Sequence, residues 1–126
     1  NPVPLNSKIN YLTNSREIAV LGVKVGKPTF NSIYDNGIYS YPINHEKDRF
    51  HPTQKPLQLI MDLVEKHSNE GDIVLDCFSG SGTTAVAAMK TNRHFIGCEI
   101  NEDYHSKSIE RLHLSNCSAK IYDKDK

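Results

Sequence analysis

A glycine-rich turn between an apolar run and a helix constrains this chain more than any other feature. The apolar run 73–75 is followed by small residues at 77–82, an alanine-rich stretch at 83–91 and a second apolar run at 94–99. A short, wholly apolar run is typical of a strand covered on both faces, and alanines let a helix approach a sheet closely. The pattern predicts an α/β fold built on strand, turn, helix and strand.

Helical and extended patterns flank this unit. Four apolar residues recur at i, i+3, i+4 and i+7, namely Leu57, Ile60, Met61 and Val64. This spacing predicts a helix that opens after Pro56 and ends near His67. Asn101 precedes two acidic residues and predicts the N-cap of a further helix. The β-branched run Glu17 to Val25 and the stretch Ala119 to Tyr122 predict two more strands.

Composition sets the class of protein. The 126 residues, of which 37% are hydrophobic, suffice for one globular domain, and the net charge is zero. No run is long enough to cross a membrane, and we expect a cytoplasmic protein. Cys77, Cys98 and Cys117 lack the spacing of a zinc site, so we expect small buried or indifferent thiols and no metal.

The turn itself suggests a ligand. A helix that begins directly after Gly80 and Gly82 presents unpaired N–H groups, and glycine permits close approach of the backbone to a ligand. Glu99 ends the next strand, where a carboxylate can accept hydrogen bonds from ribose hydroxyls. The plain alternative is a tight turn beside a solvated glutamate. The order of turn, helix and acid favours a nucleoside site, and Ala85 in third place leaves a nicotinamide dinucleotide open.

Two motifs narrow the choice by family resemblance. The segment 76–84, Asp-Cys-Phe-Ser-Gly-Ser-Gly-Thr-Thr, resembles the S-adenosylmethionine motif of DNA methyltransferases that modify an exocyclic amino group. The segment 51–56, His-Pro-Thr-Gln-Lys-Pro, is similar to the one that precedes this motif in the family's β-type order. Residues 95–101 resemble the next motif, and the resemblance extends from about Asn1 to Leu114.

The resemblance implies a partial Rossmann-like methyltransferase fold, the C-terminal portion of its sheet, with S-adenosylmethionine as cofactor. It implies ten cofactor-binding residues: Thr53, Lys55, Asp76, Phe78, Ser79, Gly80, Gly82, Thr83, Glu99 and Ile100. Among them Glu99 would take the ribose, Ile100 would lie against the adenine, and Thr53 and Lys55 would meet the methionine carboxylate. His51 is interpreted as a loop histidine that bonds backbone and binds no metal.

The family's catalytic motif has two adjacent prolines, and this chain has no Pro-Pro. The chain also begins with Asn1-Pro2-Val3-Pro4 and has no initiator Met. We therefore expect a fragment of one partial domain, inactive alone, whose catalytic half would precede Asn1. Its parts would be 1–29 after the catalytic half, 30–50 as a short target-recognition segment, and 51–126 as the cofactor-binding region.

The implied reaction is methyl transfer to an amino group of a flipped base in double-stranded DNA, with adenine N6 preferred and cytosine N4 possible. Four basic residues in and before the recognition segment could contact phosphates: Lys24, Lys27, Lys47 and Arg49. A bare sheet edge predicts a dimer or a strand swap. The alternatives are a fragment of a nicotinamide oxidoreductase and a catalytically inactive DNA-contact module.

Overall fold

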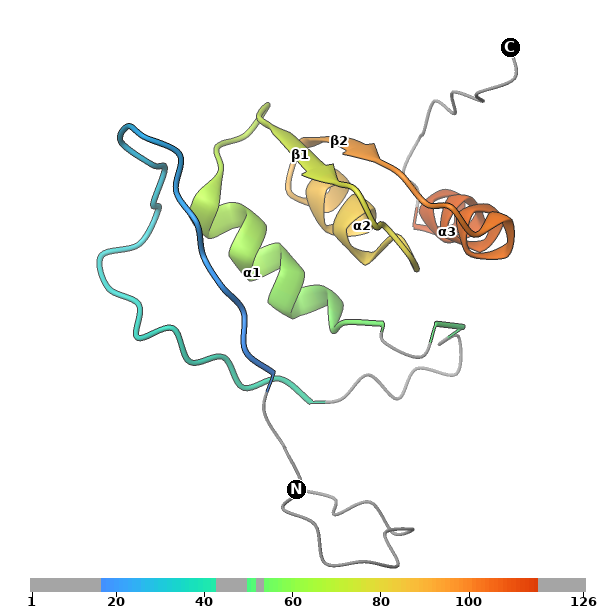
Figure 1. Ribbon diagram of the computed structural model, residues 1–126, viewed down its shortest axis with the longest axis horizontal. Coiled ribbons are helices and arrows are strands. Elements are labelled where there is room, and N and C mark those ends of the chain that lie inside the picture. Colours follow the sequence, from blue (N-terminus) through green and yellow to red (C-terminus); the bar gives the residue numbers. More distant parts are fainter. Residues whose placement is uncertain (1–16, 43–49, 52–53, 116–126) are drawn as a thin grey trace, which may run out of the picture.

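The computed structural model describes residues 17–42, 50–51 and 54–115. Within these residues the order of elements is α1 (Leu57–His67), β1 (Ile73–Asp76), α2 (Thr83–Lys90), β2 (His94–Gly97) and α3 (Glu102–Leu114) (Figure 1). Each predicted element in this part of the chain after Pro56 is confirmed, with ends within two residues of those expected. The predicted strand at 119–122 lies outside the described residues.

The two strands form a parallel pair. Ile73 lies opposite His94 and Asp76 lies opposite Gly97. Because parallel strands end at the same edge, the turn that follows β1 and the acid that follows β2 are brought side by side.

Helix α2 forms the centre of the packing. Its buried residues are Thr83, Ala85, Val86, Ala87 and Ala88. It packs against α1, both strands and α3, and in Figure 1 it lies behind the strands with α1 and α3 on either side. Small side chains allow these elements to approach closely, so a helix of modest hydrophobicity can serve as the core.

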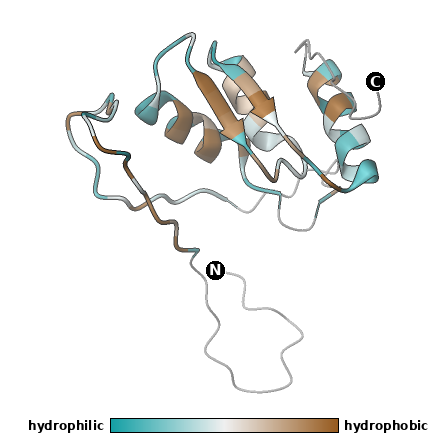
Figure 2. Cartoon of the chain, turned by 45° about the horizontal axis from the view of Figure 1, so that its top comes forward, coloured by the Kyte–Doolittle hydropathy of each residue, from teal (hydrophilic) through white to brown (hydrophobic). Residues whose placement is uncertain are grey.

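The helices cover one face of the strands in the described part of the chain. Ile73, Leu75 and Ile96 remain 64%, 62% and 53% exposed, whereas Val74 and Phe95 are partly buried (Figure 2). The prediction that run 73–75 is covered on both faces is therefore wrong for the described residues. A continuous apolar run indicates that both faces favour apolar neighbours, but none of the described residues covers the second face.

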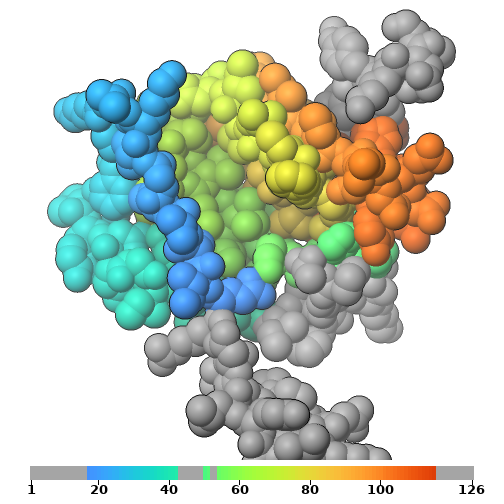
Figure 3. Space-filling view, viewed as in Figure 1, coloured from blue at the N-terminus to red at the C-terminus, as the bar shows by residue number. Residues whose placement is uncertain are grey.

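The predicted strand at Glu17 to Val25 is also wrong. These residues form no strand, and Val20 and Val25 are 93% and 103% exposed. Lys55 pairs with Glu17 before α1, and residues 21–30 line a shallow groove with His67 at the end of α1. The segment thus runs the length of α1 (Figures 1 and 3), away from any strand with which its backbone could pair in the described structure.

Residues 31–41 are fastened to α1. The Asn31 backbone N–H donates to the Lys66 carbonyl (2.8 Å), and its side-chain amide donates to the carbonyls of Glu65 (3.0 Å) and Ser68 (2.8 Å). These are carbonyls of the last helical turn, which have no partner within the helix. Asn31 therefore caps α1 from outside and fixes the start of the loop predicted as a recognition segment.

Asp35 provides the second attachment of this segment to α1. Its carboxylate accepts hydrogen bonds from the Lys66 ammonium, from the Tyr39 hydroxyl (2.6 Å) and from the Gly37 N–H (2.7 Å). The hydrogen bond from Lys66, followed by those from Tyr39 and Gly37, holds the pKa of Asp35 well below its ordinary value. The same pair raises the pKa of Lys66.

A pH titration tests this fastening. Because the pKa of Asp35 is lower in the folded than in the unfolded chain, its contribution to stability is complete above the unfolded value and is lost as pH falls toward the folded one. We expect Lys66→Met to return the pKa of Asp35 toward its ordinary value, measured from the carboxyl carbon by NMR. Lys90→Met, which removes an exposed lysine of α2, should leave it unchanged; an unchanged pKa in Lys66→Met would contradict the pairing.

Candidate nucleoside site at the carboxyl ends of the strands

The loop after β1 is shaped by its own side chains. The Asp76 carboxylate accepts from the Phe78 N–H (3.0 Å), which closes a tight turn. The backbone N–H and the hydroxyl of Ser79 both donate to the Cys98 carbonyl, at 2.9 and 3.1 Å. Asp76 therefore closes the turn, and Ser79 holds the loop against the residue that follows β2.

Gly80 and Gly82 follow with left-handed backbone conformations, φ +49° and +71°. A Cβ on Gly80 would lie 3.4 Å from His51 Nε2, and one on Gly82 would lie 3.0 Å from Ser108 Cβ. The turn thus needs backbone conformations that other residues resist, as the glycines predict. Gly82 also lets α3 pack against the start of α2, and Gly80 leaves room for His51.

Gly82→Ala should therefore destabilise the fold. The left-handed conformation costs a non-glycine residue about 1–2 kcal/mol, and the contact with Ser108 adds to that cost. Chemical denaturation should show a loss of about 2–3 kcal/mol. Gly37→Ala is the matched control, because Gly37 has φ +69° with nothing within 4 Å of its Cβ position. Equal losses in the two variants would contradict a packing role for Gly82.

The Glu99 carboxylate bridges the turn and the next helix. The Gly80 N–H donates to Glu99 Oε2 (2.7 Å) and the Asn101 N–H donates to Oε1 (2.8 Å). The prediction that Glu99 projects toward the Gly80 turn is confirmed. The two carboxylate oxygens together offer about four lone-pair sites, which is more than the backbone N–H groups use.

The surroundings keep this carboxylate charged. The Asn101 N–H lowers the pKa of Glu99 most, and the N–H groups of Gly80 and Ile100 and the nearby His51 lower it further against the opposing effect of burial. Hydrogen bonds to the charged form stabilise that form. Glu99 is therefore an anionic acceptor at neutral pH, held by backbone on both sides.

Two large apolar side chains in the segments that Glu99 joins are exposed to solvent. Phe78 is 90% exposed in the loop after β1, and Ile100, which directly follows Glu99, is 99% exposed. Such exposed apolar surface beside a charged hydrogen-bond acceptor is typical of a site for an amphipathic ring-bearing ligand.

Thr83 lies at the start of α2 as predicted, but it faces α3. It is 5% exposed, and its hydroxyl contacts the Ser81 hydroxyl (3.0 Å) and accepts from Arg111 Nη1 (2.8 Å). Arg111 also donates to the Ser81 carbonyl (3.0 Å). The hydroxyl thus joins two helices.

The sequence analysis made predictions for three residues of the segment before α1. Thr53 lies outside the described residues. Lys55 forms an ion pair with Glu17 at 2.5 Å. His51 was assigned only a backbone bond, yet its ring lies against the Gly80 turn and stacks on Tyr104 with centroids 4.4 Å apart.

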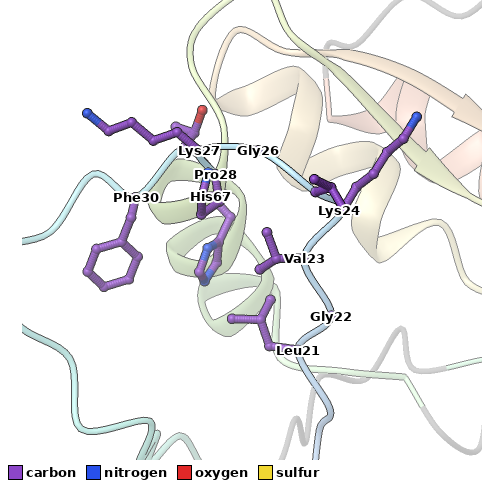
Figure 4. A pocket seen from close by; sticks show the side chains of 11 residues that line it. Leu21, Gly22, Val23, Lys24, Gly26, Lys27, Pro28, Phe30 and His67 are labelled. Carbon is purple, nitrogen blue, oxygen red and sulfur yellow. The ribbon is translucent and has the colours of Figure 1, made fainter.

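The remaining sequence candidates lie apart from the turn. Lys24 and Lys27 are exposed and help to line the groove of about 410 Å³ beside His67, and the ends of their side chains point outward from it (Figure 4). Lys47 and Arg49 lie outside the described residues.

Cys77 and Cys98 are exposed, so the expectation that they are buried is wrong. Their expected lack of a chemical role is untested, and Cys117 lies outside the described residues. Among the described residues no group of three or more His, Cys, Asp or Glu could hold a metal. In the same ranges, no helix has the length and apolar character to cross a membrane.

Comparison with known proteins identifies the family. The sequence model of a DNA methylase family matches residues 6–110. The chain belongs to the DNA methylase family. This membership confirms the family resemblance that the two motifs indicated. It favours the methyltransferase interpretation of the glycine turn over the nicotinamide-binding one, which has the same glycine spacing.

The relatives of this DNA methylase chain are methyltransferases. It is 41% identical over 93 residues to type II methyltransferase M.HindIII of Haemophilus influenzae, covering 72% of this chain and 29% of the relative. It is 47% identical over 66 residues to DNA adenine methyltransferase YhdJ of Escherichia coli, covering 52% of this chain and 22% of the relative. The chain thus spans less than a third of the length of these curated relatives.

A solved structure confirms the fold. The complex of M1.HpyAVI with SAM superposes with a TM-score of 0.61 at 40% identity, covering 72% of this chain and 47% of that one. The methylase chain therefore has part of a Rossmann-like methyltransferase fold, as the resemblance implied.

Proposed function

We propose that this chain is the cofactor-binding portion of a DNA methyltransferase that transfers a methyl group from S-adenosylmethionine to an exocyclic amino group. The observation that carries the proposal is the Glu99 carboxylate, held by the Gly80 and Asn101 N–H groups at 2.7 and 2.8 Å at the carboxyl edge of the strands. Family membership and the SAM complex of M1.HpyAVI support it.

The residues present fit an adenosine. The Glu99 carboxylate has more lone-pair sites than the backbone N–H groups around it use, which leaves acceptor capacity for ribose hydroxyls. Phe78 and Ile100 offer apolar surface for a purine, and a carboxylate flanked by apolar surface excludes a phosphate at the same point. S-Adenosylmethionine, when bound, supplies a methyl group on a sulfonium, and the chain's residues hold and orient it.

The remaining cofactor contacts belong to the same proposal. The turn residues Asp76, Ser79, Gly80 and Gly82 would shape the wall of the crevice, with Thr83 behind them. Lys55 would reach the methionine carboxylate only by leaving Glu17, an exposed ion pair of the kind that contributes little to stability. Thr53 would lie beside it.

We place catalysis itself in a Pro-Pro motif, which this sequence does not contain. The chain alone would then bind cofactor without transferring the methyl group. Adenine N6 is the preferred acceptor, and the name of the relative YhdJ, a DNA adenine methyltransferase, supports that preference. Double-stranded DNA would be the substrate, contacted through segment 30–50 and through Lys24 and Lys27.

The open sheet face predicts self-association in the absence of a covering partner. Ile73, Leu75 and Ile96 expose apolar surface beside the free edge of β1. Such edges and patches recruit other chains. We propose that the catalytic half of the enzyme covers this edge, and that the chain alone forms a homodimer through the exposed sheet edge.

Calorimetry tests the proposal. Titration of the folded chain with S-adenosylmethionine should show saturable binding at one site per chain, and titration with NAD should show none. The reverse result would favour an oxidoreductase fragment. Salt-dependent DNA association, unaffected by S-adenosylmethionine, in a folded chain that binds neither cofactor would favour a DNA-contact module.

A further inference from the structure

His51 occupies the space between the two segments that Glu99 bridges. On one side its ring atoms Nε2, Cδ2 and Cε1 lie 3.4, 3.7 and 3.8 Å from where a Cβ of Gly80 would be. On the other side the ring packs in a tilted arrangement against Tyr104, with centroids 4.4 Å apart and planes inclined by 58°. The imidazole thus occupies the space that a side chain at Gly80 would fill, and it contacts Tyr104 of α3.

Tyr104 belongs to the same structural unit as the acid. Its N–H donates to the Asn101 side chain (3.0 Å), which caps α3, and the Asn101 N–H donates to Glu99. The His51 ring is therefore next to both segments whose N–H groups hold the carboxylate. A residue that packs against both anchors can fix the direction of the carboxylate without touching a ligand.

The backbone carbonyl of His51 has a hydrogen-bond partner. The Gln54 N–H donates to the His51 carbonyl (3.1 Å), and Gln54 is 7% exposed. The ring therefore projects from a buried anchor just ahead of α1. Its position depends on the tertiary fold and not on the turn alone.

We propose that His51 is a positioning residue that, packed between Gly80 and Tyr104, aims the Glu99 carboxylate at the ribose and so sets selectivity for ribose over 2′-deoxyribose. The inference rests on the proposed function for its ligand, but the bridge that it concerns exists without one. Selectivity follows because a carboxylate held in one orientation can accept a hydrogen bond from a second ribose hydroxyl and so gain affinity. A loosely held carboxylate gains less from that hydroxyl.

The test uses two readouts. The first is the ¹H–¹⁵N resonance of Gly80, which lies downfield when its N–H donates to a carboxylate and should move upfield in Glu99→Gln. The second is the affinity for S-adenosylmethionine, together with the ratio of affinities for adenosine and 2′-deoxyadenosine. His51→Ala should move the Gly80 resonance upfield, weaken S-adenosylmethionine binding about tenfold and reduce the ratio.

Matched variants separate positioning from general damage. His51→Phe keeps a ring between Gly80 and Tyr104 and should restore both readouts. Tyr104→Leu should displace the Gly80 resonance as His51→Ala does. His113→Ala, which removes an exposed histidine at the end of α3, should change neither. In a Glu99→Gln background, His51→Ala should add little further loss, because the two changes remove one interaction.

The outcomes distinguish the two proposals. Binding by the natural chain, with the Gly80 resonance and the ribose ratio unchanged in a folded His51→Ala variant, overturns the positioning role alone. If the natural chain binds no S-adenosylmethionine while its Gly80 resonance moves in His51→Ala and returns in His51→Phe, the proposed function fails and the positioning role stands.

Discussion

Glu99→Gln should weaken S-adenosylmethionine binding at least about thirtyfold, on the order of 2 kcal/mol. Glutamine keeps the size of the side chain but replaces one acceptor oxygen by a donor NH₂ group. Because Gly80 and Asn101 both present N–H groups to this side chain, one of them would face a second donor. The amide also removes the negative charge and one acceptor from the ribose site.

Calorimetry measures this loss directly. Glu102→Gln is the matched control, because Glu102 is an exposed acid only three residues away in the first turn of α3. It should leave the affinity unchanged. Equal weakening in both variants would indicate a general effect of charge, and an unchanged affinity in Glu99→Gln would remove Glu99 from the site.

Arg93→Met should destabilise the chain by about 3 kcal/mol. Arg93 is 8% exposed and its guanidinium joins the ends of two helices. Its Nε donates to the Ser68 hydroxyl (3.1 Å), its Nη2 to the Ser68 carbonyl (2.7 Å), and its Nη1 to the Thr91 carbonyl. Ser68 and Thr91 are the C-caps of α1 and α2, where a cation also interacts favourably with the helix dipoles.

The size of the effect comes from what the substitution leaves behind. Methionine preserves the apolar stem but leaves two carbonyls and a hydroxyl at a buried junction without their charged donor. Arg93→Lys should give an intermediate loss, because an ammonium cannot reproduce the planar fork. Lys90→Met, one turn earlier and exposed, is the control and should stay within about 0.5 kcal/mol of the natural chain in urea unfolding. A loss in Arg93→Met no larger than that would show that the junction is held by packing alone.

Elements whose signals are local could be predicted from the sequence. The helix face at Leu57 to Val64, the N-cap at Asn101 and the glycine turn each depend on residues a few positions apart, and each is present. The side of the turn reached by Glu99 was also predictable, because parallel strands end together.

Features that depend on distant partners could not be predicted. The run Glu17 to Val25 has strand propensity, but a strand also needs a neighbour with which to pair, and the described structure provides none there. The packing of Gly82 against Ser108 could not be predicted either, because Ser108 lies 26 residues further along the sequence. Arg93 belongs to no motif, and the motif that contains His51 does not reveal its contact with Tyr104, since both roles depend on elements that lie far away in the sequence.

A structure of the chain crystallised with S-adenosylmethionine would test the central claim most directly. We predict that the two ribose hydroxyls lie within about 3 Å of the Glu99 carboxylate oxygens, while the Gly80 and Asn101 N–H groups keep their hydrogen bonds to it. A bound cofactor whose ribose hydroxyls are held by other groups, with Glu99 still occupied by backbone alone, would contradict this account.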